Sequence, residues 1–167
     1  APMVITHGNG PQVGDLLLMA EAARDAVPEL PLGVLVADSQ GQMGYMIQQS
    51  LKNRFITAGI RRDVVTVLTQ VVVNRDDPRL AEFTKPIGPF LDERVARERM
   101  RAGGARYAED AGRGWRRVVP SPKPLSLVEL EIIRDLVLDR DVVIACGGGG
   151  IPVYYEPDGR MEGVDAV

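Results

Sequence analysis

The stretch that most constrains the fold is VITHGNGPQVG, residues 4–14. Met3 to Thr6 is typical of a short apolar strand, and the glycines after it permit a tight turn and a close backbone approach. Pro11 suits the first turn of a helix because its missing N–H has no partner there, so a helix is expected to open near Gln12. Free N–H groups at such a helix start favour an anion. A tight strand-to-helix turn without a ligand is the alternative.

Two further apolar runs, Asp63 to Val73 and Asp141 to Cys146, are rich in β-branched residues and indicate buried strands of a parallel sheet. Apolar spacing predicts helices over residues 13–26, 36–58 and 126–139. Ser126 and Glu129 match a capping box at the start of the last helix. Helices between strands indicate an α/β domain with a mostly parallel sheet.

Residues 76–119 differ from the rest and are expected to form an inserted lid subdomain. Thr84 to Pro89 is interpreted as a stiff loop punctuated by prolines, and Leu91 to Arg101 as a charged helix with few apolar anchors. Tyr107 to Val119 is typical of a hairpin that turns near Gly112. Few buried contacts would make this segment mobile, as a lid must be.

Composition excludes several classes of function. A length of 167 residues allows one domain with a sizeable core, and a net charge of −3 argues against nucleic acid as the main partner. No apolar run is long enough to span a bilayer, so no membrane partner is expected. The single cysteine, Cys146, cannot form an internal disulfide, which favours the reducing cytoplasm. One cysteine and one histidine argue against a structural zinc site.

The candidate binding residues are two glycine loops and two lysines. Gly8–Gly10 and Gly147–Gly150 each follow an apolar strand, and ligands gather at the carboxyl ends of strands in open α/β sheets. Neither loop fits a dinucleotide or P-loop pattern. Four consecutive glycines cost folding entropy, which favours a ligand-facing role over a surface turn. Lys85 and Lys123 stand beside prolines and could neutralise a phosphoryl group; solvated loop lysines are the alternative.

Four other residues are weaker candidates. Arg113, Arg116 and Arg117 could add positive potential in the expected hairpin, although such a charge run is more typical of a solvated face. His7 is interpreted as a hydrogen-bonded residue at a strand end rather than as a base. No Ser-His-Asp or Cys-His arrangement is recognisable in the sequence.

Six motifs follow one another as they do in the carbamate kinases of the amino-acid kinase superfamily: THGNGPQVG, SQGQMGYM, LTQVVVNRDDP, FTKPIGPF, GRGWRRVVPSPKPLS and VIACGGGGIPV. The chain resembles this family over nearly its whole length. The resemblance implies a three-layer αβα sandwich around a mostly parallel sheet, with a protruding lid. It implies reversible phosphoryl transfer between carbamoyl phosphate and ADP, giving ATP and carbamate with Mg²⁺. It also implies a cytoplasmic homodimer that serves fermentative arginine breakdown, the arginine deiminase pathway.

The resemblance further implies roles for the candidate residues. Lys85 would be the catalytic lysine that closes over the transferring phosphate. The substrate-binding residues would be Gly8, Asn9 and Gly10, with Lys123 as a further candidate. The nucleotide–phosphate channel would be lined by Gly147, Gly148, Gly149 and Gly150. Such a reaction requires positioning and charge neutralisation rather than a nucleophilic side chain. No metal ligand is assigned.

The family pattern extends beyond both ends of this sequence. A strand with a Gly-Gly-Asn loop is expected before Ala1, and an Asp-Lys-Asp segment with the adenine-binding half after Val167. The chain is therefore expected to be a piece of a longer protein. Two alternatives stay open: a non-catalytic anion-binding or dimerisation module, and another amino-acid kinase acting on a different acceptor.

Overall fold

The computed structural model describes residues 1–28, 30–103 and 105–167. Its centre is a parallel sheet in the order β1-β8-β2, built from β1 (Met3–Ile5), β8 (Val142–Ile144) and β2 (Val64–Thr66). The apolar run at residues 141–146 predicted β8, whose three residues are all buried.

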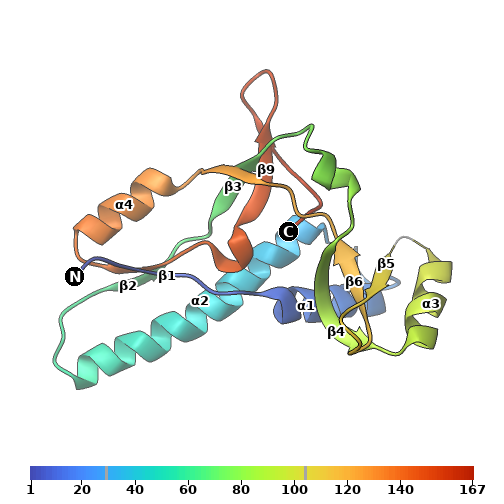
Figure 1. Ribbon diagram of the computed structural model, residues 1–167. Helices are drawn as coiled ribbons and strands as arrows, with labels where there is room; N and C mark the ends of the chain where they lie inside the picture. Colours follow the sequence, from blue (N-terminus) through green and yellow to red (C-terminus); the bar gives the residue numbers. More distant parts are fainter. Residues whose placement is uncertain (29, 104) are drawn as a thin grey trace.

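Two helices cover the central sheet on opposite faces (Figure 1). The long helix α2 (Leu32–Thr57) packs Ile47, Leu51 and Phe55 against β2 and β8 on one face. The helix α4 (Leu130–Leu138) packs Ile133, Leu136 and Val137 on the other. Successive side chains of β8 point to opposite faces, so Val142 and Ile144 contact α2 while Val143 belongs to the cluster with α4. The three-layer α/β fold predicted from the sequence is confirmed.

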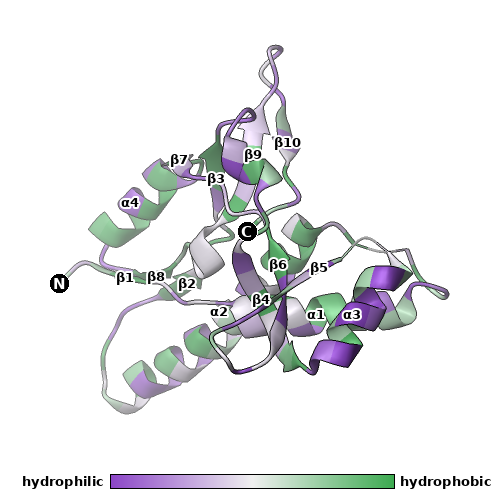
Figure 2. Cartoon of the chain, turned by 45° about the vertical axis from the view of Figure 1, so that its right-hand side comes forward, coloured by the Kyte–Doolittle hydropathy of each residue, from purple (hydrophilic) through white to green (hydrophobic). Residues whose placement is uncertain are grey.

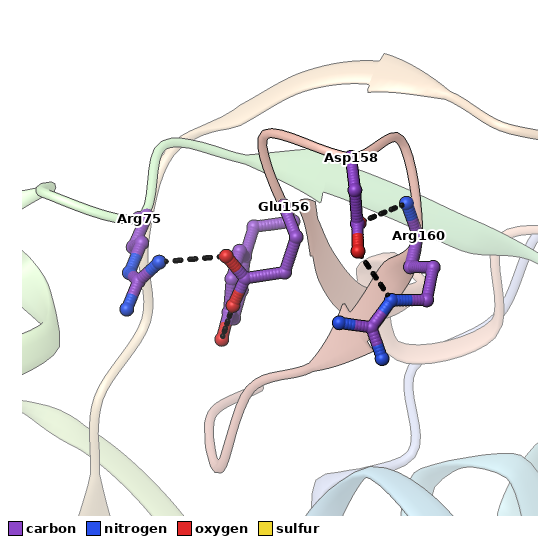
Figure 3. A network of polar contacts seen from close by, with 5 residues as sticks. Arg75, Glu156, Asp158 and Arg160 are labelled. Carbon is purple, nitrogen blue, oxygen red and sulfur yellow. Dashed lines mark hydrogen bonds and ion pairs between the residues drawn. The ribbon is translucent and has the colours of Figure 1, made fainter.

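A second sheet has four strands in the order β10-β9-β3-β7. It contains β10 (Met161–Gly163), β9 (Ile151–Tyr155), β3 (Gln70–Val73) and β7 (Pro124–Leu127), with β9 and β3 parallel and the outer pairs antiparallel. Figure 3 shows the ion pair of Arg75 with Glu156, at 2.9 Å, which joins the turn after β3 to the β9–β10 hairpin.

The expected continuous strand from Asp63 to Val73 is wrong. The run is divided into β2 and β3, which belong to different sheets, and residues 67–69 between them lie in neither strand. At this break the backbone N–H of Thr69 donates to Oε1 of Gln40 at 2.8 Å instead of joining a strand ladder. A side chain from helix α2 therefore satisfies a backbone group in the gap between the two strands.

The expected capping box is also wrong. Ser126 lies in β7, where it is paired with Val72 of β3, and α4 begins at Leu130. The Glu129 carboxylate instead accepts from the backbone N–H and the side-chain amide of Gln70, at 2.7 and 2.9 Å. Pairing with a distant strand replaces the local cap.

The third sheet is antiparallel, in the order β4-β6-β5, and carries the helix α3 (Glu93–Ala102). Its strands are β4 (Lys85–Leu91), β6 (Trp115–Val119) and β5 (Arg106–Glu109), and a short 3-10 turn, η1 (Pro78–Ala81), precedes it. Figure 2 shows α3 as a strongly hydrophilic helix, and Ala96 is its buried residue. The predicted hairpin is confirmed by the β5–β6 pair. Movement of residues 76–119 as a lid stays a prediction.

The loop expected over Thr84 to Pro89 is wrong, because all but its first residue lies in β4. This strand is at the edge of its sheet, and edge strands tolerate prolines. The expectation of few buried contacts is wrong as well. Ile87 and Val119 join a core cluster with residues of the two N-terminal helices: Val13, Leu17, Leu32, Leu35 and Val36.

The helix α1 (Gly10–Ala23) lies directly against β4 (Figure 1). A Cβ atom added to Gly14 would lie 1.7 Å from the Cα atom of Gly88, so the two backbones touch. Gly88 has a φ of +74°, a conformation that favours glycine. The third sheet is thus seated on α1. No helix within the described residues has the length and apolar character needed to cross a membrane.

We expect Gly14→Ala to lower the free energy of unfolding by about 2–3 kcal/mol, because the added methyl group forces α1 and β4 apart. Gly41→Ala is the matched control, since Gly41 also lies in a helix and an added Cβ would have no neighbour within 4 Å. That change should raise stability by up to about 1 kcal/mol. Urea unfolding measures both, and equal effects of the two substitutions would contradict the close packing.

Candidate functional site

A cavity of about 830 Å³ lies where the two glycine loops, the start of α1 and the first half of β4 meet. It is at the carboxyl ends of β1 and β8, where ligands are expected in this class of fold. Of the predicted site residues, six line it: Gly8, Asn9, Gly10, Lys85, Gly148 and Gly149. The structure therefore brings together the segments that the sequence placed far apart.

The first glycine loop offers backbone groups to this cavity. Asn9 is 6% exposed, and its side-chain amide donates to Oγ of Ser39 at 2.8 Å, so this side chain braces the loop. Its carbonyl accepts from the N–H of Val13 at 2.9 Å. Among the described residues, no backbone hydrogen bond outside helices and strands uses the N–H groups of Gly8, Asn9 or Gly10. A ligand role for Asn9 would therefore fall to its backbone.

The second glycine loop is packed tightly against the first. A Cβ atom on Gly147 would lie 2.5 Å from the ring of His7, and one on Gly148 would lie 2.2 Å from the amide of Asn9. The N–H of Gly148 donates to the His7 carbonyl at 2.8 Å. Gly148, Gly149 and Gly150 have φ values of 68°, 97° and 99°. Close packing and backbone conformation thus require glycines here, in addition to any ligand.

Two cationic side chains line the cavity. Lys85 is the exposed first residue of β4. Arg116 of β6 is 15% exposed, and its guanidinium donates to the carbonyl of Gly88 at 2.8 Å and to Asp110 at 3.1 Å. This hydrogen bond holds the pKa of Asp110 below its ordinary value. The position of the Arg116 charge is therefore fixed on two sides.

From its sequence context, Arg116 was predicted to be only a weak candidate for the site. The missed signal is the alternation of a strand, in which neighbouring residues face opposite sides. Arg117 accordingly pairs with Glu21 of α1, while Arg116 faces the cavity. A charge run in a loop gives no such division, but the same run in a strand directs one arginine to each face.

Three predicted residues do not line the cavity. Gly147 and Gly150 are the two ends of the second glycine loop and lie outside the cavity lining. A Cβ atom on Gly150 would lie 2.4 Å from Val71. Lys123 is exposed, and its backbone N–H donates to Asp77 at 2.9 Å beside the turn after β3. This hydrogen bond, followed by the one from Arg79, lowers the pKa of Asp77. The backbone of Lys123 is thus fixed beside Asp77, outside the cavity lining.

The lining favours an anion. Among the described residues that line the cavity there are two cationic side chains, those of Lys85 and Arg116, and no Asp or Glu side chain. Burial, together with the charge of Glu129, raises the pKa of the Cys146 thiol, so this lining residue stays neutral. Within the described part of the chain no cluster of three His, Cys, Asp or Glu side chains is arranged to hold a metal ion.

Comparison with known proteins agrees with the sequence motifs. No family model matches the chain. It is 52% identical over 167 residues to the carbamate kinase of Pyrococcus horikoshii, which covers 99% of this chain and 53% of the relative. It is 50% identical over 166 residues to carbamate kinase 1 of Enterococcus faecium, covering 99% and 52%. The structure of Giardia lamblia carbamate kinase bound to citric acid matches with a TM-score of 0.95, at 45% identity over 99% of this chain and 53% of that one.

The chain is a homologue of the carbamate kinases. Identity near half over almost every residue, together with the matching fold, confirms the resemblance noted in the six motifs. The chain spans about half the length of the carbamate kinases that it matches.

Protonation of Asp110 provides a test of the Arg116 anchor. A carboxyl whose pKa is lowered by folding stabilises the protein above its ordinary pKa of about 3.9, and this contribution is lost as pH falls through the lower folded value. Unfolding free energies of the wild type measured between pH 6 and pH 2 should therefore decrease on acidification. The unfolding free energy of Asp110→Asn should decrease less steeply below about pH 4, because residue 110 then takes up no proton. Parallel curves for the two proteins would show that the Arg116–Asp110 contact does not stabilise the folded protein.

Proposed function

We propose that this chain forms the carbamoyl-phosphate-binding part of a carbamate kinase. In the proposed reaction a β-phosphate oxygen of ADP attacks the phosphorus of carbamoyl phosphate, the bond from phosphorus to the carbamoyl oxygen breaks, and carbamate leaves as ATP forms. The observation that carries the proposal is the cavity where both glycine loops, Lys85 and Arg116 meet and where no Asp or Glu side chain is among the described lining residues. Homology to the carbamate kinases supports the choice of substrates.

The cavity suits a phosphoryl group on physical grounds. Helix α1 begins at Gly10 with its positive end toward the cavity, and the N–H groups of Gly8, Asn9 and Gly10 are available as donors. Phosphoryl transfer spreads charge over the equatorial oxygens, so positioned donors and cations supply most of the catalysis. Lys85 would neutralise the transferring group, and Arg116 would add a fixed positive charge.

The second loop would face the nucleotide side. Gly148 and Gly149 line the cavity without side chains, so a diphosphate can approach their backbone closely. The Giardia relative has also been solved bound to AMP-PNP, which supports a nucleotide partner for the family.

Mg²⁺ enters the proposal only with the nucleotide. Carboxylate, carbonyl and water oxygens are its usual ligands, and the described lining residues include no Asp or Glu side chain. The residues present thus do not form a magnesium site of their own, and no step of the proposed transfer is assigned to one.

A homodimer, a cytoplasmic location and a role in arginine breakdown belong to the same proposal. The support for a dimer is an apolar set on α2, where Tyr45, Met46 and Ile56 are 62%, 50% and 67% exposed. Sedimentation of the purified protein measures the oligomeric state. The single cysteine supports the location.

Two lysines beside prolines provide a matched test of the reaction. Lys85→Gln should lower kcat by about 10²–10³-fold, because a charge aimed at the transferring phosphate is lost. Lys123→Gln should leave kcat within about twofold, since Lys123 lies outside the cavity lining. The measurement is coupled formation of ATP from carbamoyl phosphate and ADP by the protein expressed from its complete gene.

Each result has a defined meaning. Unchanged turnover in Lys85→Gln would remove Lys85 from the mechanism, and an equal loss in both variants would contradict the different placement of the two lysines. A folded wild type without ATP formation would count against the carbamate kinase proposal. A panel of other carboxylate and phosphate acceptors would then test the remaining amino-acid kinase activities.

A further inference from the structure

Four polar side chains are buried directly behind the two glycine loops. Asn9, Ser39, Gln40 and Thr69 are 6%, 0%, 2% and 0% exposed, and each forms hydrogen bonds to the others or to nearby backbone. A buried polar group is costly unless its hydrogen bonds are satisfied, so an apolar core is the simpler solution for stability alone. The cluster therefore calls for another explanation.

Gln40 of α2 uses both ends of its side-chain amide. Its Oε1 accepts from the backbone N–H of Thr69 at 2.8 Å. Its Nε2 donates to the carbonyl of Gly147 at 2.9 Å and to that of Thr69 at 3.2 Å. One planar group thus joins the break between β2 and β3 to the second glycine loop.

Thr69 provides a second connection between the same segments. Its hydroxyl accepts from the backbone N–H of Cys146 at 2.9 Å and donates to the carbonyl of Val67 at 2.9 Å. Two consecutive residues at the start of the loop are therefore fixed by hydrogen bonds: Cys146 by Thr69, and Gly147 by Gln40.

Ser39, the neighbour of Gln40, holds the first loop. Its hydroxyl accepts from the Asn9 amide at 2.8 Å and donates to the carbonyl of Val36 at 2.6 Å. Adjacent residues of one helix thus each fix one of the two loops that line the cavity.

We propose that Gln40 is a positioning residue, which with Thr69 and Ser39 sets the spacing between the two glycine loops and hence the alignment of the two phosphate-bearing partners. A loop of four glycines has no side chains to pack into a core, so polar contacts to its backbone must define its position. Gln40 and Thr69 supply these contacts at Gly147 and Cys146. The proposal rests on the proposed function for its ligands, but the geometry of the loops stands on its own.

The expected consequence separates catalysis from stability. Phosphoryl transfer needs the reacting atoms about 3–3.5 Å apart, and a displacement of about 1 Å can cost about 100-fold in rate. Loosening the second loop should therefore reduce turnover far more than a core substitution of similar effect on stability.

The test compares Gln40→Met with Leu51→Ala. Methionine keeps the length of the side chain and removes the amide. Leu51 lies on the same helix about three turns away and packs against the central sheet rather than the loops. Amide hydrogen exchange at residues 147–150, measured at matched global stability, should be about tenfold faster in Gln40→Met than in Leu51→Ala. In the protein from the complete gene, kcat should fall about 100-fold in Gln40→Met alone.

A second pair of variants covers the case in which Gln40→Met does not fold. Thr69→Val removes the hydroxyl at nearly constant volume, and Thr69→Ser retains it. Thr69→Val should speed exchange at the loop and lower kcat, and Thr69→Ser should restore both toward the wild type.

Wild-type exchange and turnover in Gln40→Met, or equal changes in Leu51→Ala, would overturn the proposal. The exchange measurement needs no substrate. Faster loop exchange in a protein that does not transfer phosphate from carbamoyl phosphate would therefore keep the positioning role and reject the proposed substrate.

Discussion

The parallel pairing of β1 with β8 is the constraint on which the candidate site depends. Ile5 is paired with Ile144, so both strands end at the same level and both glycine loops begin side by side. The backbone pairing continues past the strands, from the N–H of Ala145 to Ile5 at 3.0 Å and from that of Gly148 to His7 at 2.8 Å. The two loops therefore act as one wall of the cavity, and the close approach of Gly148 to Asn9 follows from this pairing.

Helix α1 connects this wall to the third sheet. Its first residue, Gly10, lines the cavity, Gly14 touches Gly88 of β4, and Glu21 pairs with Arg99 and Arg117. The strands that carry Lys85 and Arg116 therefore contact the same helix that follows the first glycine loop. Any opening of the third sheet must break the Gly14–Gly88 contact or move α1, and moving α1 would disturb the proposed anion site directly.

Local patterns predicted what local contacts decide, and failed where a distant element intervenes. The strand before Cys146, the β5–β6 hairpin and the glycine loops at strand ends were all correct, because periodicity and turn residues specify them. The break at Thr69 was missed because the backbone N–H of Thr69 bonds to the side chain of Gln40 on helix α2, a contact that the local sequence does not reveal. Ser126 was assigned to a helix because its pairing with Val72 is not visible in the local sequence. Arg116 was undervalued for a different, local reason: the alternation of side chains along β6 separates it from Arg117, and this alternation was not applied to the charge run.

The contrast between Lys85 and Lys123 shows how the charge of the cavity is determined. Both lysines stand beside prolines, so stiffness alone could not distinguish them. Lys85 is paired with Val119, which is buried in the core cluster with α1 and α2, so the register of β4 on β6 sets where this ammonium group lies. A shift of one residue in that register would turn Lys85 to the opposite face and remove it from the cavity. Lys123 lies after β6 has ended, and its backbone is bound to Asp77. Strand register, rather than the neighbouring prolines, therefore places in the cavity the positive charge that the proposed phosphoryl transfer requires.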